Sequence, residues 1–376
     1  MSKVKEAEVG LSKDQEFTEK YFNSNKELHT NFEEFRGDYK ISTGSKIFDL
    51  AVDGGLQSGL VRFVGPTEGG KTSEALEIQA NYLESLENSK GIFVLAEGRL
   101  SDKMKERSRS TFVYHPKDWV NGTVLVFECN IYETVFDWLR ELVTKHSDKT
   151  RYCIIIDSMD GLLPEAALKK STSDAAKIAA GAVMTGDFLR RTNGYMAKRG
   201  HLCIMMGQVR AEIKGQYEAK DKNKLGGASG GNAAVHYPDW VFEFQRPRPT
   251  EKILPKGAGE GELTLAKKPI GQLAKVKIWK STNETSMIVI QYPVKFGRVG
   301  RSSVWVEREI VDLLLQWGFF EKKGSWFSSS EELTQSLELE EPIKVQGIES
   351  IYELLEKDSE LTDKLNEFCD NNILNV

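Results

Sequence analysis

The segment GPTEGGKT (residues 65–72) constrains the fold more than any other stretch of the chain. It follows the apolar run LVRFV and precedes a stretch with helical spacing, so a strand must turn into a helix across it. An ordinary strand-to-helix turn also accepts glycine, which adopts left-handed backbone angles at low cost. With a strand before it and a helix after it, the pattern G-x-x-x-x-G-K-[ST] favours a phosphate-binding loop.

Such a loop predicts a site for a nucleoside triphosphate. Glycines let successive backbone N–H groups converge on phosphate oxygens, and the helix N-terminus adds the positive end of its dipole. Lys71 is predicted to hold the β- and γ-phosphates, and the Thr72 hydroxyl to bind Mg²⁺. The predicted nucleotide-binding residues are Gly65, Pro66, Thr67, Glu68, Gly69, Gly70, Lys71, Thr72, Ser73 and, from a later strand, Asp157.

Two carboxylates are predicted to complete this site. Asp157 ends the apolar run YCIIID. An isolated Asp there commonly caps the next turn, but with a phosphate loop upstream it becomes the predicted acidic partner of Mg²⁺, beside Thr72. Glu97 ends GIFVLAE, which we expect to be the strand next to the loop. A carboxylate at that end of an open α/β sheet points into the ligand crevice, so Glu97 is a candidate to orient the attacking water; an exposed loop residue is the alternative.

Strand-like and helix-like patterns alternate from residue 41 to about 325, which predicts an α/β fold with a mainly parallel, twisted sheet flanked by helices. Several predicted strands are near-continuous apolar runs, typical of strands buried on both faces. Shorter connections late in this region indicate antiparallel members. The predicted strands are 60–65, 91–97, 123–129, 152–157, 202–208, 240–245, 274–280 and 286–292, with helices at 73–88 and 131–146.

The composition limits the class of protein and shows one asymmetry in the distribution of charge. No run approaches the roughly 18 apolar residues of a membrane-spanning helix, the chain begins without the apolar segment of a signal peptide, and the four cysteines form no metal-type pair, so we expect an intracellular protein.

Residues 198–301 hold 19 Lys and Arg against 9 Asp and Glu, whereas residues 330–376 hold 13 acidic residues against 3 basic ones. The basic region is predicted to face a polyanion whose access the acidic tail modulates; solvated surface lysine is the alternative.

Six segments, in order, resemble the core of the RecA recombinases. They are ISTGSKIFDLAVDGGLQSGLVRFVGPTEGGKT (41–72), GIFVLAEGRL, IIIDSMDGLLPEA, MGQVRAEI, GGNAAVHYPDWVFEFQR and VEREIVDLLLQWGFFEKKGSWF (306–327). The resemblance implies an N-terminal oligomerisation segment (1–40), a RecA-like ATPase and DNA-binding core (41–327) and an acidic C-terminal helical region (328–376). The divergent ends fit a phage member of the UvsX sort at least as well as a bacterial one.

The resemblance also implies catalytic roles. Glu97 matches the glutamate that activates water, Gln208 the glutamine that senses the γ-phosphate, and Lys280 a lysine that reaches a neighbouring subunit's γ-phosphate. With Lys71, these are the predicted catalytic residues. The chain departs from the family pattern in two places: GRLSDKMKERS lacks the Asp-x-x-Tyr that flanks adenine, with Asp102 only a loose substitute, and Thr282 stands where a second lysine is expected.

Two segments match the family's mobile DNA-binding loops. The second, residues 210–233, is polar and glycine-rich; its lysines can neutralise phosphates and its aromatic residue can wedge between bases, although an insertion with no partner is the alternative. The predicted DNA contacts are Lys169 and Lys170 in the first loop and Arg210, Lys214, Tyr217, Lys220, Lys222, Lys224, Gly230, Gly231 and Asn232 in the second.

The sequence therefore predicts an ATP- and Mg²⁺-dependent DNA recombinase that forms a helical filament on single-stranded DNA and pairs it with duplex DNA. Its expected place is the cytoplasm of a bacterium or phage-infected cell, with no membrane partner. Two alternatives stay open. A hexameric helicase on the same fold needs a closed ring and an arginine finger, whereas this chain carries the recombinase-type GGNA. A non-catalytic, ATP-gated DNA-binding or filament-regulating protein is the other alternative, which the two departures keep open.

Overall fold

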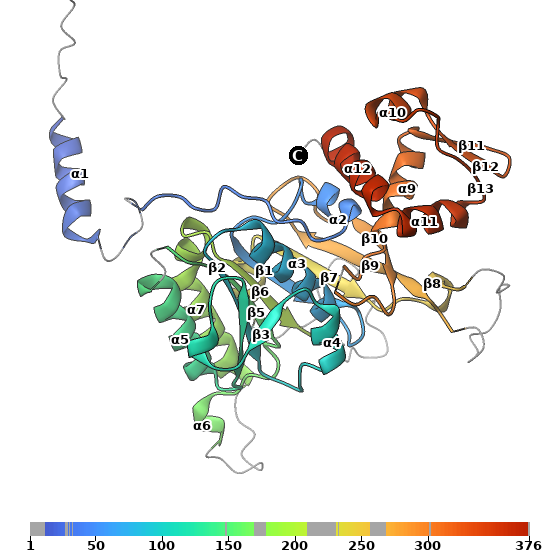
Figure 1. Cartoon of the computed structure of the whole chain (residues 1–376). Coiled ribbons are helices and arrows are strands. Elements are labelled where there is room, and N and C mark those ends of the chain that lie inside the picture. Colours follow the sequence, from blue (N-terminus) through green and yellow to red (C-terminus); the bar gives the residue numbers. More distant parts are fainter. Residues whose placement is uncertain are drawn as a thin grey trace, which may run out of the picture.

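A mostly parallel sheet forms the centre of the protein (Figure 1). The computed structural model describes residues 12–26, 29, 31, 33–146, 149–168, 178–208, 231, 233–255, 268–300 and 302–374. Within these residues the sheet has ten strands: nine follow the order β10-β9-β7-β1-β6-β5-β2-β4-β3, and β8 pairs with β9 outside this order. The strands are β1 (Gly59–Val64), β2 (Ser89–Leu95), β3 (Thr111–Val113), β4 (Thr123–Glu128), β5 (Arg151–Asp157), β6 (Leu202–Gly207), β7 (Trp240–Gln245), β8 (Lys252–Ile253), β9 (Gly271–Lys280) and β10 (Val289–Lys295).

The predicted α/β class is confirmed. The pairs from β7 through β3 are parallel, and β9 pairs antiparallel with β7, β8 and β10, so the antiparallel members come late, as predicted. The expectation that Glu97 follows the strand next to the phosphate loop is wrong. β6 and β5 lie between β1 and β2, because a helical crossover lets consecutive parallel strands occupy distant positions in a sheet.

Helices cover both faces of the sheet because side chains alternate along each strand. On β1, Val61 packs in a cluster with α2 (Lys46–Ala51) and α3 (Lys71–Ser85), whereas Leu60 packs in the opposite cluster with α5 (Tyr132–Lys145) and α7 (Ile178–Lys198). Shorter helices occupy the connections: α4 (Asp102–Arg107), α6 (Glu165–Leu168) and α8 (Ala233–His236).

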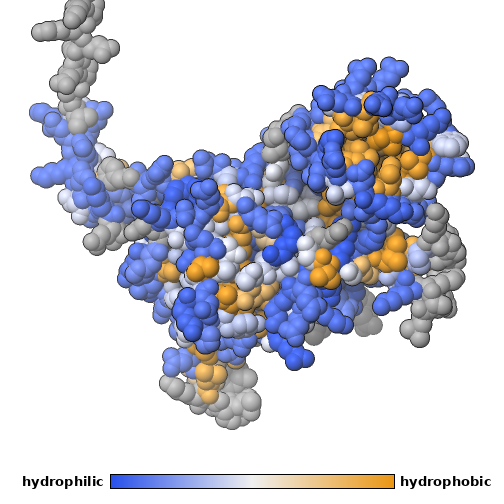
Figure 2. Space-filling view, in the orientation of Figure 1, coloured by the Kyte–Doolittle hydropathy of each residue, from blue (hydrophilic) through white to orange (hydrophobic). Residues whose placement is uncertain are grey.

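The C-terminal part of the chain packs around a hydrophobic cluster of its own, which extends from Trp305 to Ile373. We call residues 305–374 the C-terminal unit; Figure 2 shows hydrophobic residues gathered on its visible face. The resemblance implies a domain boundary at residue 328, and that boundary stays a prediction. The C-terminal unit defined by packing begins before this residue, and it contains a small antiparallel sheet as well as helices. Its elements are α9 (Val306–Gln316), β11 (Phe320–Lys323), β12 (Trp326–Ser329), α10 (Glu331–Ser336), β13 (Lys344–Gln346), α11 (Ile348–Lys357) and α12 (Ser359–Cys369).

The N-terminal helix α1 (Lys13–Ser24) stands clear of the rest of the protein (Figure 1). A capping box between Ser12 and Gln15 starts the helix, but none of its residues is buried. Phe17 and Tyr21, one turn apart, are 69% and 58% exposed and their rings stack. The connecting segment does contact the core, where the Arg36 N–H donates to the Lys198 carbonyl.

Glu309 of α9 joins the C-terminal unit to the start of α2. Its carboxyl group accepts hydrogen bonds from the Ser45 hydroxyl and from the N–H groups of Lys46 (2.9 Å) and Ile47 (3.2 Å). The side chain is fully buried, and this burial raises its pKa from 4.5 to about 7. The folded protein therefore keeps a proton that the unfolded chain releases.

We predict that Glu309→Gln flattens the pH dependence of stability. The contribution of this proton is fully present below pH 4.5 and is lost as the pH rises through about 7. Between pH 5 and pH 8 the unmodified protein should lose about 2–3 kcal/mol more free energy of unfolding than the variant, which cannot titrate. Urea unfolding at both pH values measures the difference; equal losses in the two proteins would contradict the assignment.

Candidate nucleotide-binding site

A cavity of about 440 Å³ opens at the carboxyl ends of the parallel strands. The phosphate loop forms one side of it, and the residues that follow β2, β5 and β6 form the floor. Of the residues predicted from the sequence, the cavity gathers Thr67, Glu68, Gly69, Gly70, Lys71, Thr72, Ser73, Glu97, Asp157 and Gln208.

The loop has the backbone that its glycines predict. Gly65 and Gly70 have φ values of 141° and 98°, in the region that L side chains rarely adopt, and Gly70 is the N-cap of α3. The Lys71 ammonium group donates to the carbonyls of Gly65 and Pro66, both at 2.8 Å. Burial lowers the pKa of Lys71, while the nearby carboxylates of Asp157, Asp160 and Glu97 oppose this effect.

Thr72 and Asp157 meet at the floor of the cavity. The Thr72 hydroxyl donates to Asp157 Oδ2 at 3.0 Å, although β6 lies between β1 and β5 in the sheet. Burial raises the pKa of Asp157, and the hydrogen bond from Thr72 opposes it. A hydroxyl and a carboxylate are the hard oxygen ligands that Mg²⁺ prefers alongside phosphate oxygens, so these two residues fit the predicted metal.

Glu97 and Gln208 reach the same cavity from different strands. The Ser158 hydroxyl, directly after Asp157, donates to Glu97 Oε1. The Gln208 N–H donates to Asp160 Oδ2 at 2.7 Å, which fixes the backbone where β6 ends. Gln208 is also the last described residue before 209–230, so the cavity and the predicted second DNA loop are continuous along the chain.

Lys280 is not among the described residues that line the cavity. It ends β9 beside Val241, near the start of β7, whereas the phosphate loop follows the other end of β1. Its ammonium group donates to the carbonyls of His236 and Pro238 in the same chain. One subunit therefore does not bring Lys280 to its own phosphate loop, and its role across a subunit boundary stays a proposal.

Most predicted DNA contacts lie outside the described residues. These are Lys169, Lys170, Arg210, Lys214, Tyr217, Lys220, Lys222, Lys224, Gly230 and Asn232. Gly231 is described and has a φ of 65°; an added Cβ would come within 2.9 Å of the Ala182 Cβ on α7.

The outer walls of the cavity come from residues that the sequence analysis did not assign. α4 supplies Met104 and Arg107, and the end of β10 with the turn after it supplies Lys295, Phe296 and Arg298. The two walls meet where the Gly300 N–H donates to the Glu106 carbonyl at 3.3 Å. A signal was present in the sequence, because the basic, glycine-containing stretch KFGRVGR begins at residue 295, shortly after the predicted strand 286–292.

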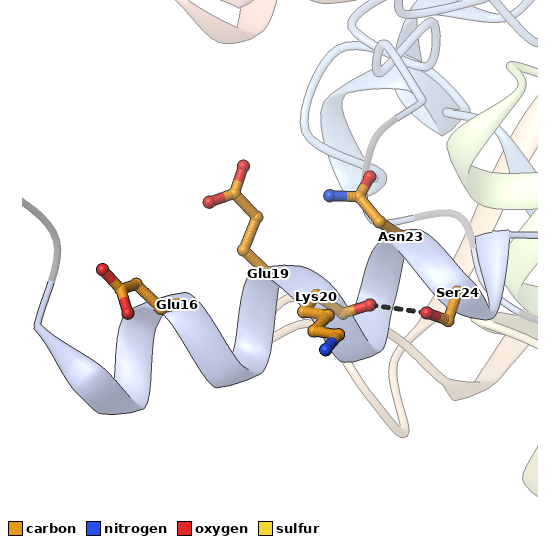
Figure 3. Close-up of a pocket in the computed structure, with 5 residues that line it drawn as sticks. All are labelled: Glu16, Glu19, Lys20, Asn23 and Ser24. Carbon is orange, nitrogen blue, oxygen red and sulfur yellow. Dashed lines mark hydrogen bonds between the residues drawn. The ribbon is translucent and has the colours of Figure 1, made fainter.

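A second pocket lies on α1 and is shown in Figure 3. Its lining residues, Glu16, Glu19, Lys20, Asn23 and Ser24, all belong to this one exposed helix. The contact drawn there is the Ser24 hydroxyl donating to the Lys20 carbonyl at 2.8 Å. None of the predicted site residues is in this pocket, and we assign it no ligand.

Comparison with known proteins finds that the chain is similar to RecA proteins. No protein-family model matches the chain. It is 27% identical to the protein RecA of Nostoc sp. over 289 residues, which cover 77% of this chain and 71% of that protein. It is 26% identical to the protein RecA of Chlorobaculum tepidum over 328 residues, which cover 86% and 81%. The protein RecA of Synechococcus elongatus is also 26% identical, over 292 residues.

The parallel sheet and the phosphate-loop segment at the edge of the cavity are those of an α/β P-loop fold. Within this class, the chain is a distant homologue of the RecA proteins, and this homology supports a RecA-type ATPase. The narrower resemblance to UvsX stays a prediction. In the described part of the chain, every helix is too short or too polar to span a membrane.

We predict that Gly65→Ala damages the protein more than Gly70→Ala. A Cβ on Gly65 would lie 2.2 Å from the Phe244 carbonyl oxygen of β7, whereas a Cβ on Gly70 meets nothing within 4 Å. The first change should cost about 3 kcal/mol or more in free energy of unfolding, and the second about 1–2 kcal/mol from its left-handed backbone alone. Urea unfolding of both variants measures this, and an equal loss in the two would contradict the crowding at Gly65.

Proposed function

We propose that this protein is an ATP-dependent DNA recombinase, which assembles as a filament on single-stranded DNA and exchanges strands with a homologous duplex. One observation carries the proposal: a single cavity gathers the phosphate loop, Asp157, Glu97 and Gln208, and Gln208 directly precedes the lysine-rich segment 209–230. A change at the phosphate end of the cavity thus has a short covalent path to the predicted DNA contacts. The homology to RecA proteins supports the same function.

Lys71, Thr72 and Asp157 would bind the nucleotide. The Lys71 ammonium group, now on the carbonyls of its own loop, would exchange them for phosphate oxygens. Thr72 and Asp157 would hold Mg²⁺, which neutralises charge on the phosphates when it is bound. The Glu97 carboxylate, oriented by the Ser158 hydroxyl, would accept a proton from the attacking water, and the Gln208 side chain would hydrogen-bond the terminal phosphate.

The base would lie between the two outer walls of the cavity. Met104 and Arg107 on α4 line the same cavity as Phe296, which is 42% exposed. An aromatic ring and a guanidinium group both stack on the face of a base. These residues would replace the missing Asp-x-x-Tyr as the contacts of the adenine.

Filament contacts would use both ends of the core. Lys280, at the end of the sheet away from its own phosphate loop, would reach the γ-phosphate held by the next subunit. The exposed Phe17 and Tyr21 of α1 would dock on a neighbouring copy, since burying an aromatic pair is favourable and the described part of the same subunit leaves both rings exposed.

The central test is Glu97→Gln in a DNA-stimulated ATPase assay. The amide cannot accept the proton from water, so turnover should fall at least about 100-fold while ATP-dependent binding to single-stranded DNA is retained. Lys71→Ala is the comparison variant and should lose both activities. If the unmodified protein binds ATP and DNA without turnover, the non-catalytic regulator is the better assignment.

A second prediction concerns assembly. Replacing both Phe17 and Tyr21 by Ala should leave the free energy of unfolding within about 0.5 kcal/mol, because the rings are exposed in the isolated subunit. The same change should prevent filaments on single-stranded DNA with a non-hydrolysable ATP analogue, as seen by electron microscopy. Normal filaments from this variant would exclude α1 as the docking arm.

A third prediction concerns DNA binding by the second loop. Replacing Lys220, Lys222 and Lys224 by Ala should weaken binding to single-stranded DNA. It should also reduce the slope of log affinity against log salt by about 0.7 for each phosphate that the protein no longer neutralises. Replacing Lys117, Lys145 and Lys149, which are exposed and lie on segments with no proposed role, removes the same charge and serves as the control. Equal effects of the two triple variants would show general electrostatics and not a DNA-binding loop.

A further inference from the structure

Lys295, the last residue of β10, lies between the nucleotide cavity and the C-terminal unit. Its side chain lines the cavity beside Phe296 and Arg298. Its ammonium group forms an ion pair with Glu356 on α11 and lies 4.7 Å from the ring centroid of Trp305. The side chains of Lys295 and Glu356 are each 25% exposed. Lys295 of the cavity wall is thus paired with a residue on a helix of the C-terminal unit that lies far away in the sequence.

Arg298, the neighbouring cation in this wall, is held differently. It pairs with Glu307, both side chains being 10% exposed or less, and it also donates to the Val304 carbonyl at 3.0 Å. A buried, multiply bonded guanidinium is costly to move. Lys295 has a flexible stem, and its ion pair with Glu356 is more exposed than the pair of Arg298, so it costs less to break. Of these two cations, Lys295 is the one that a bound anion can recruit.

We propose that Lys295 is a phosphate-binding residue of this cavity and that Glu356 is a positioning residue which competes with the bound nucleotide for it. The inference rests on the proposed binding of ATP and adds a regulatory role for the C-terminal unit. With the cavity empty, Glu356 holds Lys295 and thereby fixes α11 against the core. A bound triphosphate, with more negative charge than one carboxylate, draws Lys295 away and loosens α11.

This exchange couples two sites, and coupling is reciprocal. If a bound nucleotide loosens the contact between α11 and Lys295, then a change that breaks this contact must tighten nucleotide binding. The two effects are equal in size. The C-terminal unit does not leave the core, because Lys46 of α2 pairs with Asp370 and Glu309 caps α2. These contacts would keep the unit on the core while α11 attaches and releases.

The test measures ATP·Mg²⁺ affinity by calorimetry on the full chain and its variants. Glu356→Gln should bind ATP about three- to fivefold more tightly, the range that one partly exposed ion pair supports. Lys295→Gln should bind more weakly, and adding Glu356→Gln to it should have no further effect. Glu367→Gln, which removes an exposed charge from α12, is the matched control and should behave as the unmodified protein.

Hydrogen exchange supplies a second measurement, which reports on α11 itself and not on affinity. Saturating ATP·Mg²⁺ should speed amide exchange in α11 of the unmodified protein but not of Lys295→Gln. The inference is overturned, while the proposed function stands, by any one of three results. The first is an unchanged ATP affinity in Glu356→Gln, and the second is a gain in affinity from Glu356→Gln that is as large in the Lys295→Gln background as in the unmodified protein. The third is unchanged amide exchange in α11 on ATP binding. If the unmodified protein binds no ATP, the proposed function fails and this inference with it.

Discussion

The contact between Thr72 and Asp157 is the interaction on which the site depends. It joins the first turn of α3 to the end of β5, across the intervening β6. Because β1, β6 and β5 are parallel and in register, their carboxyl ends meet at one edge, and residues far apart in sequence converge there. Glu97 then completes the floor through Ser158, the residue after Asp157. The sheet order sets these distances.

Buried carboxyl groups extend from this site toward the C-terminal unit. Glu74 of α3 accepts a hydrogen bond from the Tyr292 hydroxyl of β10 at 2.7 Å, and Asp49 of α2 accepts one from the Thr43 N–H at 2.7 Å. Burial raises the pKa of Glu74, Asp49 and Glu309 alike. The helix that begins at the phosphate loop is therefore tied to β10, whose last residue contacts α11. Nucleotide binding and the position of the C-terminal unit share these connections.

The cavity combines residues from the RecA-like segments with residues outside the motifs identified in the sequence. The phosphate loop and the floor match the segments that resemble RecA, at an overall identity of 26–27%. The outer walls instead present Met104, Arg107, Lys295 and Phe296. Two of these four carry positive charge, and one of them is bonded to the acidic C-terminal region. Of the two departures from the family pattern, the one at GRLSDKMKERS therefore lies at the cavity, whereas Thr282 lies away from it.

The sequence by itself determined the strand–loop–helix around residues 65–72, the α/β class and most strand positions. These follow from local causes: glycine at left-handed backbone angles and unbroken apolar runs in buried strands. It also indicated the late antiparallel strands from their short connections.

Only the tertiary structure decided the strand order. In that order β1 and β2 are separated, whereas they were predicted to be neighbours. The tertiary structure likewise decided that Lys295 and Glu356 meet, and that residues 305–374 share one core. The physical reason is that periodicity records which face of an element is buried but not which element covers it. Crossover connections allow many strand orders, and contacts across long sequence separations are fixed when the layers pack.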